Sequence, residues 1–220
     1  MSISDNLTDI RQHIPDSVCL VAVSKTKPIS ALQQAYQAGQ RVFGENKVQE
    51  LCTKQAGMAD DILWHFIGHL QTNKVKYIAP FISLIHSVDS LKLMQEINKE
   101  ALKNNRIIHC LLEFHIASEE SKFGLNLASS KTILSSAEFH KMENIRIDGV
   151  MGMATYTEDI QQVHREFHNL KNIFDQLKSA YFPEQEHFRI ISMGMSDDYP
   201  IAIEEGSTMI RVGSLIFGER

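Results

Sequence analysis

One lysine of this sequence stands where a buried strand is expected to end. The apolar run Val18–Val23 leads directly into SKTKP, residues 24–28. A charged side chain at the end of a buried strand costs free energy unless a ligand or partner uses it. Desolvation lowers the pKa of a lysine amine, and the neutral amine can then form a Schiff base with a carbonyl ligand. A solvated surface lysine is the plainer interpretation of any single lysine.

Two lysines of this segment compete for such a role. Lys25 and Lys27 share strand parity, so alternation alone does not choose between them. We favour Lys25, because Pro28 and the turn before it are expected to carry Lys27 away from the strand end.

Two glycine-containing loops near the end of the chain could hold an anion. They are SMGMS, residues 192–196, and RVGS, residues 211–214. Glycine lets backbone N–H groups approach an anion closely, and serine adds a hydroxyl donor. Neither loop contains a lysine, so a phosphate would be held mainly by amides. Together the loops predict a ligand that carries a phosphate.

Arg211 opens the second loop and closes the last apolar run. In a closed barrel it would lie beside the first strand, and therefore near Lys25. The alternative is an arginine in the barrel interior, paired with a carboxylate such as Glu113. Both interpretations stay open on the sequence alone.

These residues are distributed along a regular alternation of apolar runs and helical patterns. The runs are continuous rather than alternating, as in strands that a parallel sheet buries on both faces. A first amphipathic helix, Ile3–Ile14, precedes them and ends before Pro15. The runs are Val18–Val23, Arg41–Gly44, Trp64–Gly68, Leu84–Val88, Ile107–Phe114, Ile147–Met153, Phe188–Gly194 and Thr208–Gly213; the helical patterns include Ser30–Ala38, Leu91–Lys103, Ala128–Phe139 and Asp159–Ala180.

About eight strand–helix units are the number that closes a (β/α)₈ TIM barrel. An open doubly wound sheet is the competing α/β fold, but the first strand leads to SKTKP and not to a GxGxxG turn. No linker or repeat divides the chain. We therefore predict a single barrel domain over residues 1–220 with an extra N-terminal helix.

Composition narrows the functional classes. The formal charge is −5 over 220 residues without a basic segment, which disfavours nucleic acid as a partner. No run is long enough to span a membrane, and MSISDNLTDI lacks the layout of a signal peptide. Three scattered cysteines suit a reducing compartment. We expect a cytoplasmic protein without membrane contact, and a single closed barrel can be a monomer.

Several other polar residues invite a functional interpretation. His164 and His168 lie four apart, a spacing that can hold zinc, but HREFH is not HExxH and we favour a solvated helix face without a metal. His65 is predicted to be buried and hydrogen-bonded. Glu204 and Glu205 are predicted on the exposed face of a short helix. SDD, residues 196–198, is expected to cap that helix.

The motifs taken together resemble those of the pyridoxal-phosphate homeostasis proteins, which are related to the N-terminal barrel of alanine racemase. The resemblance covers nearly the whole chain and implies pyridoxal 5′-phosphate (PLP) as cofactor, held as a Schiff base on Lys25. It implies that Asn46 lies near the ring and that Arg211 faces the ring nitrogen. It places the phosphate on Ser192, Gly194, Met195, Ser196, Gly213 and Ser214. The motifs are AVSKTKP, FGENKVQE, WHFIGHLQTNK, ESKFGL, GVMGMATY and SMGMSDDYPIAIEEGSTMIRVGSLIFGER.

Arginine beside the ring nitrogen disfavours transaminase or decarboxylase chemistry, because arginine stays charged and can only donate. The sequence given ends at Arg220, so we expect no second domain with an acid or base. The resemblance implies a protein that stores, buffers or delivers PLP, with PLP-dependent apo-enzymes as the recipients. A slow PLP-dependent amino-acid racemase is the alternative, and a Schiff-base aldolase that works without PLP is a remote third. Whether Lys27, Lys74 or Lys122 offers a second PLP site is not readable from the sequence.

Overall fold

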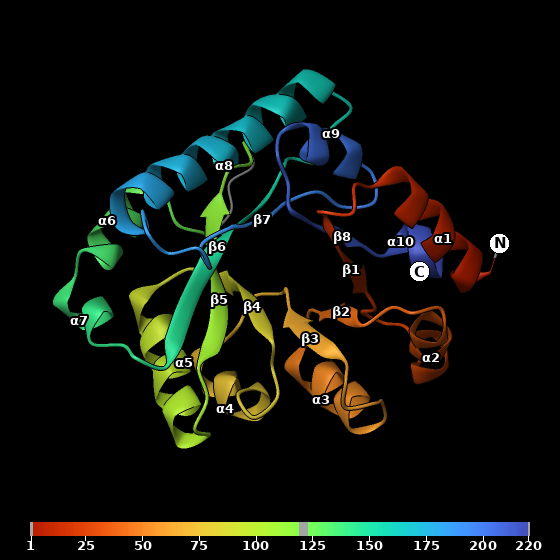
Figure 1. Ribbon diagram of the computed structural model, residues 1–220, viewed down its shortest axis with the longest axis horizontal. Helices are drawn as coiled ribbons and strands as arrows, with labels where there is room; N and C mark the ends of the chain where they lie inside the picture. The colour runs from red at the N-terminus through yellow and green to blue at the C-terminus, as the bar shows by residue number, and fades with distance from the viewer. Residues whose placement is uncertain (1, 119–122, 220) are drawn as a thin grey trace.

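The computed structural model describes residues 2–118 and 123–219. Eight parallel strands close into a barrel in chain order, and the helices form a ring around it, which confirms the predicted (β/α)₈ fold (Figure 1). The strands are β1 Cys19–Val23, β2 Val42–Glu45, β3 Leu63–Phe66, β4 Leu84–Val88, β5 Ile108–His115, β6 Ile145–Met153, β7 Ile190–Ser192 and β8 Met209–Val212.

The barrel is closed by the pairing of β1 with β8, in a register that sets Val21 beside Arg211. Strand residues alternate between the barrel interior and the helix-facing side. Val21, Leu84, Leu111, Met151 and Met209 form a small cluster of their own, apart from the larger core that the helices share with the strands. The first and last strands therefore bring the two ends of the sequence together.

The helices follow the strands as a (β/α)₈ pattern requires. The long helix after β6 shows the reason: Val163, Phe167, Leu170 and Leu177 recur every three to seven residues and are all buried. Burying one such side chain contributes about 2 kcal/mol. The helices are α1 Ile3–His13, α2 Ile29–Gln37, α3 Val48–Ala56, the 3₁₀ turn η1 Thr72–Lys74, α4 Val75–Ile78, α5 Leu91–Lys103, α6 Leu127–Leu134, α7 Ala137–His140, α8 Ile160–Tyr181, α9 Tyr199–Glu204 and α10 Ser214–Phe217.

Helix α1 precedes the first strand, as predicted. A capping box fixes its start, since the Ser2 hydroxyl accepts from the Asp5 N–H and the Asp5 carboxylate accepts from the Ser2 N–H. Asn6 Nδ2 donates to the Ile216 carbonyl, 3.0 Å away, and ties α1 to α10. The two ends of the chain lie on the same side of the barrel (Figure 1).

One predicted helix was wrong. The pattern over Ala128–Phe139 forms two helices, α6 and α7, separated at Ser135 and Ser136. The Ser136 hydroxyl accepts a hydrogen bond from the Phe139 N–H and starts a new helix. A serine in this position competes with the helix for its own backbone groups, and the periodicity of apolar residues does not reveal it.

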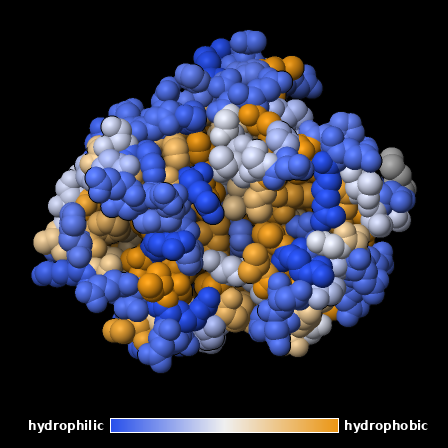
Figure 2. Space-filling view, viewed as in Figure 1, coloured by the Kyte–Doolittle hydropathy of each residue, from blue (hydrophilic) through white to orange (hydrophobic). Residues whose placement is uncertain are grey.

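The surface is mainly polar around the periphery. In Figure 2 hydrophilic side chains cover most of the rim, whereas hydrophobic ones are visible mainly toward the middle of the same face. Among the described residues, no helix has both the length and the apolar character needed to cross a bilayer.

Candidate functional site

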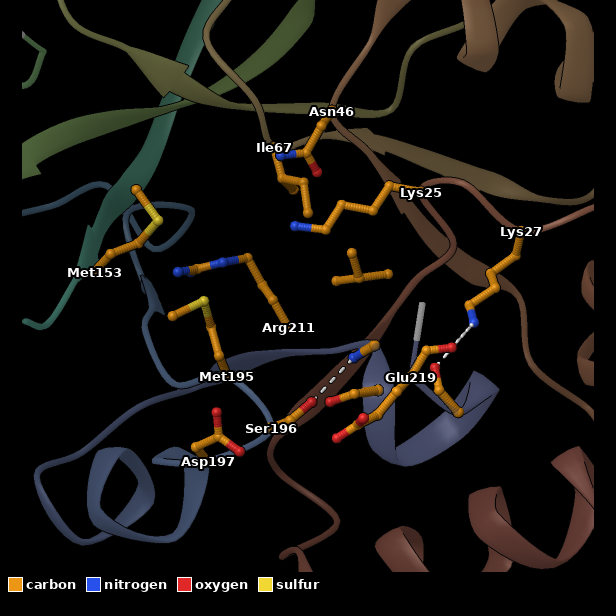
Figure 3. A pocket seen from close by; sticks show the side chains of 14 residues that line it. Lys25, Lys27, Asn46, Ile67, Met153, Met195, Ser196, Asp197, Arg211 and Glu219 are labelled. Atoms are coloured by element: carbon orange, nitrogen blue, oxygen red, sulfur yellow. Dashed lines mark hydrogen bonds between the residues drawn. The ribbon is translucent and has the colours of Figure 1, made fainter. Parts of the chain in front are cut away.

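A cavity of about 260 Å³ opens at the carboxyl ends of the strands (Figure 3). Its walls come from the carboxyl ends of β1, β6 and β8 and from the segments that follow β1, β2, β3, β7 and β8. This is the end of a (β/α)₈ barrel at which ligands bind. Most of the residues singled out from the sequence line it, namely Lys25, Asn46, Met195, Ser196, Arg211, Gly213 and Ser214.

Lys25 and Lys27 are oriented differently within this cavity. The Lys25 side chain extends into the cavity toward Asn46 and Ile67 (Figure 3). Lys27 also contributes to the wall, but its Nζ donates to the carbonyls of Gly218 and Glu219, each 2.9 Å away. Of these two lysines, Lys25 is thus the one whose side chain extends into the cavity.

Arg211 lies in the floor of the cavity with a side chain that is almost fully buried. Its Nη1 donates to the Ser192 carbonyl at 2.8 Å and to the Ser192 Oγ at 2.7 Å, and its Nη2 donates to the Gly152 carbonyl at 3.1 Å. Burial lowers the pKa of Arg211 to about 10, so it remains a cation at neutral pH.

The alternative pairing of Arg211 with Glu113 is not formed. Within residues 2–118 and 123–219 no carboxylate lies within ion-pair distance of Arg211. Glu113 is buried, its Oε2 has no hydrogen-bond partner among those residues, and burial raises its pKa to about 7. Nearby Asp89 raises that pKa further, whereas Arg211 lowers it.

A chain of uncharged groups continues from Arg211 into the barrel. Ser192 Oγ lies 3.0 Å from His86 Nδ1, and His86 Nε2 lies 3.0 Å from His65 Nδ1. Burial lowers the pKa of His65 to about 3, and burial together with the electrostatic influence of the neighbouring His65 and Arg211 lowers the pKa of His86. Both rings are therefore neutral, each with one donor and one acceptor nitrogen. The prediction of a buried, hydrogen-bonded His65 is confirmed.

The two glycine-containing loops meet at the other side of the cavity. The Gly213 N–H points to Ser196 Oγ, 3.4 Å away, so the two loops touch. A Cβ on Gly213 would lie 3.2 Å from the Val23 carbonyl oxygen, tighter than normal packing. Ser196, Gly213 and Ser214 therefore form a polar wall that a phosphate could approach.

Two residues predicted for the phosphate do not line this cavity. Ser192 is buried behind it and binds Arg211 and His86. Gly194 adopts φ +95°, and a Cβ there would lie 2.6 Å from Ala202 Cβ of α9. Both residues thus shape the wall from behind.

The prediction that SDD caps the following helix needs correction. Asp198 is the N-cap residue of α9, but its side chain makes no cap hydrogen bond. Its Oδ1 instead accepts from the Met195 N–H at 2.5 Å, which folds the SMGMS loop back on itself. The same contact holds Met195 against the cavity.

Asn46 provides a buried polar atom at the cavity. Its Oδ1 is buried at the cavity and accepts no hydrogen bond from any residue that the structure describes. An unsatisfied buried polar atom costs free energy unless a ligand meets it. This observation fits a small polar ligand beside Lys25.

The remaining candidates lie elsewhere. His164 and His168 on α8 both hydrogen-bond to Glu205, with Nδ1 to carboxylate distances of 2.8 and 3.1 Å. Glu204 is exposed, as predicted, whereas Glu205 takes part in these contacts with the two histidines.

The other lysines considered for a second PLP site are Lys74 and Lys122. Lys74 Nζ lies 5.7 Å from the centre of the Tyr77 ring. Lys122 and the start of the ESKFGL motif fall outside the described residues.

Sequence reasoning missed two sets of residues. His86 stands in the short strand LIHSV at an inward-facing position, two residues after the inward-facing Leu84, which was a usable signal. Lys54 was overlooked as well: it lies three residues after the buried Leu51 on the apolar face of α3, and it is itself buried. It contacts Ser24, Glu45 and Glu50 around the base of the Lys25 segment.

The sequence is similar to a known protein family along its whole length. The model of the family described as the alanine racemase N-terminal domain matches residues 1–220. A pyridoxal phosphate homeostasis protein of Aquifex aeolicus is 40% identical over 202 residues, which are 91% of this chain and 86% of that protein.

Solved structures extend the comparison. The PipY protein of Synechococcus elongatus superposes with a TM-score of 0.92 in its form without PLP and 0.89 with PLP bound, at 35% and 34% identity, over 99% of this chain and all of PipY. An alanine racemase of Clostridium difficile shares the fold at 17% identity and a TM-score of 0.78, and this chain covers 56% of that protein.

Proposed function

This chain belongs to the pyridoxal phosphate homeostasis protein family, and from that premise we propose that it binds PLP as a Schiff base on Lys25 and takes part in PLP homeostasis. The observation that carries the proposal is the convergence of Lys25, Arg211 and the two glycine loops on one cavity. The relative whose structure was solved with PLP bound supports the choice of cofactor.

The residues of the cavity fit a phosphorylated pyridine aldehyde. Lys25 extends into it, and the buried Asn46 Oδ1 offers a polar contact beside the lysine. Ser196, Gly213 and Ser214 supply hydroxyl and amide groups on the opposite wall for the phosphate. Arg211 supplies a fixed cation between them for the ring nitrogen.

Each residue has a defined chemical task in this proposal. Lys25 would hold PLP through its amine, in its neutral form, by a C=N bond that replaces the aldehyde C=O and releases one water. When bound, PLP supplies an electron sink whose strength depends on protonation of its ring nitrogen. Arg211 can donate to that nitrogen but cannot give it a proton, because guanidinium stays charged. The neutral His65–His86–Ser192 chain keeps the guanidinium in place.

We infer that storage, buffering or delivery of PLP is the role, rather than turnover. A weak electron sink suits a protein that holds the cofactor and hands it to apo-enzymes. A slow racemase is the second candidate, favoured only by the shared fold with alanine racemases. Measuring D- and L-alanine interconversion against free PLP separates the two, and a rate above that of free PLP would favour the racemase.

Titration with PLP tests the proposal directly. We expect a visible absorption band to form with the unaltered protein and with Lys27→Ala, and not with Lys25→Ala. Lys27 is the matched control because it comes from the same segment and its ammonium is bound to the carbonyls of Gly218 and Glu219. Equal bands in all three proteins would contradict Lys25 as the binding residue.

A further inference from the structure

The segment that carries Lys25 is held by a buried charged cluster outside the cavity. Lys54 of α3 is 4% exposed, and its Nζ donates to the Ser24 carbonyl at 2.7 Å. The same Nζ contacts Glu45 Oε1 at 2.7 Å and Glu50 Oε1 at 2.6 Å. We call Lys54, Glu45 and Glu50 the Lys54 cluster.

The cluster forms hydrogen bonds with the residues on both sides of Lys25. The Ser24 Oγ donates to Glu45 Oε1 at 2.5 Å. The Thr26 N–H donates to Glu50 Oε1 at 2.6 Å. Because Ser24 and Thr26, the residues directly before and after Lys25, are both held, the direction in which the Lys25 side chain leaves the backbone is fixed.

The backbone conformation of Thr26 is one that threonine does not favour, so the contacts of this segment act against a local conformational preference. Its φ is +66°, in the left-handed region that β-branched residues rarely adopt. Such a backbone persists only where its surroundings enforce it. The Thr26 N–H donates to Glu50, and the Lys27 N–H donates to the Ser24 carbonyl at 3.0 Å. Glu50 is therefore the side chain that supports this conformation, beside the backbone hydrogen bond of the turn.

The cluster is a poor device for stability alone. Burial raises the pKa of Glu45, although hydrogen bonds from Lys54 and Ser24 pull it back. Glu45 Oε2 has no partner among the described residues. Buried charges of this kind are often no more stabilising than apolar side chains of similar volume. Their contacts with Ser24 and Thr26 point to positioning instead.

We propose that Lys54, through Glu45 and Glu50, is a positioning residue that fixes the Ser24–Thr26 backbone so that Lys25 enters the cavity. This rests on the proposed function, because the value of the orientation lies in presenting the Lys25 amine to PLP. The cluster touches the backbone and side chains of the neighbours of Lys25, so it directs the lysine without taking part in the condensation.

Glu50 offers the sharpest test because its side chain is only partly buried. Glu50→Ala removes the acceptor of the Thr26 N–H, and Glu50→Gln keeps an amide oxygen there. Glu96→Ala is the control, since it removes the carboxylate of an exposed pair with Lys99 on α5. Lys54→Met is a second disruption of the cluster, and the Glu50 variants decide the question if it does not fold.

Two measurements are made on each variant. Hydrogen exchange of the peptide containing Ser24–Thr26 is followed in the PLP-free protein. PLP dissociation is then followed in the loaded protein, after mapping the borohydride-reduced pyridoxyl group to Lys25. Losing a hydrogen bond to a charged group predicts that Glu50→Ala speeds both processes by about tenfold or more, whereas Glu50→Gln and Glu96→Ala stay within about twofold.

The outcomes separate the two levels of the proposal. Absence of the pyridoxyl group from Lys25 in the unaltered protein would overturn the proposed function, and the positioning role with it. A labelled Lys25 with unchanged PLP dissociation in Glu50→Ala would overturn positioning alone, whether or not exchange had accelerated. Faster exchange and faster dissociation in Glu50→Ala, both restored in Glu50→Gln, would support positioning.

Discussion

Two buried polar groups flank the cavity, and they differ in charge. Behind Arg211, the chain of Ser192, His86 and His65 is neutral, because burial keeps both imidazoles unprotonated. Behind the Lys25 segment, the Lys54 cluster contains one cation and two carboxylates. Neutral acceptors leave the charge of Arg211 available to a ligand, whereas charged groups exert a strong hold on backbone that would otherwise relax.

The two groups therefore predict different sensitivities. A charged buried cluster is costly to break, since removing one member leaves its partner unpaired. A neutral chain loses less when one member is removed, but it is vulnerable to protonation.

Removing the cation of the charged cluster should have the largest effect. Lys54→Met leaves Glu45 buried without its ammonium partner and is expected to lower the free energy of unfolding by about 3–5 kcal/mol. Urea denaturation measures the loss. Adding Glu45→Gln should recover part of it, and a loss in Lys54→Met below about 1 kcal/mol, as for a surface pair, would contradict the account.

The buried carboxyl of Glu113 should respond to rising pH. Its folded pKa is about 7, above the ordinary 4.5, so its stabilising contribution is complete below about pH 4.5 and lost as pH rises through 7. The free energy of unfolding of Glu113→Gln, relative to that of the unaltered protein, should therefore be larger near pH 8 than near pH 5. The expected increase is up to about 3 kcal/mol. Urea denaturation at both values tests this, with exposed Glu143→Gln as control; parallel pH profiles would refute it.

The neutral chain should respond in the opposite direction. The folded pKa of His65 is about 3, below the ordinary 6.5, so its contribution is complete above about pH 6.5 and lost on acidification toward 3. Between pH 7 and pH 5 the free energy of unfolding of the unaltered protein should fall by about 2 kcal/mol more than that of His65→Gln. Exposed His140→Gln is the control for this urea series, and equal acid sensitivity of all three proteins would count against the neutral chain.

The smallest effect is expected at the link between the chain and Arg211. Ser192→Ala removes one acceptor, but Nη1 and Nη2 keep the carbonyls of Ser192 and Gly152. We expect the free energy of unfolding, measured by heat or urea, to fall by about 1 kcal/mol. Ser87→Ala is the matched control, because the buried Ser87 Oγ has no partner among the described residues and its removal should be neutral or stabilising. Equal losses at both serines would show that the link is unimportant.

The sequence predicted the fold well because continuous apolar runs are a strong local signal. Leu84–Val88 and Leu91–Lys103 match β4 and α5 to the residue. The break between α6 and α7 was missed, since it depends on the hydroxyl of Ser136 rather than on any periodicity. Local hydrogen bonding of this kind competes with helix propensity and is hard to recognise from sequence.

Most of the predicted site residues line one cavity, whereas the residues that hold them from behind were not predicted. Lys25 and Arg211 stand at strand ends, where a barrel gathers its site, so their meeting was foreseeable. The contacts of Ser192 with His86 and of Lys54 with Ser24 join residues 106 and 30 positions apart. Contacts between such distant residues depend on strand register and helix rotation, which a single sequence does not specify.

The measurement that tests the central claim most directly is borohydride reduction of the PLP-loaded protein, followed by peptide mapping. The account predicts that the visible band disappears and that the pyridoxyl group is found on the peptide containing Lys25, at that lysine. A pyridoxyl group on Lys27 or another lysine, with Lys25 unmodified, would contradict it.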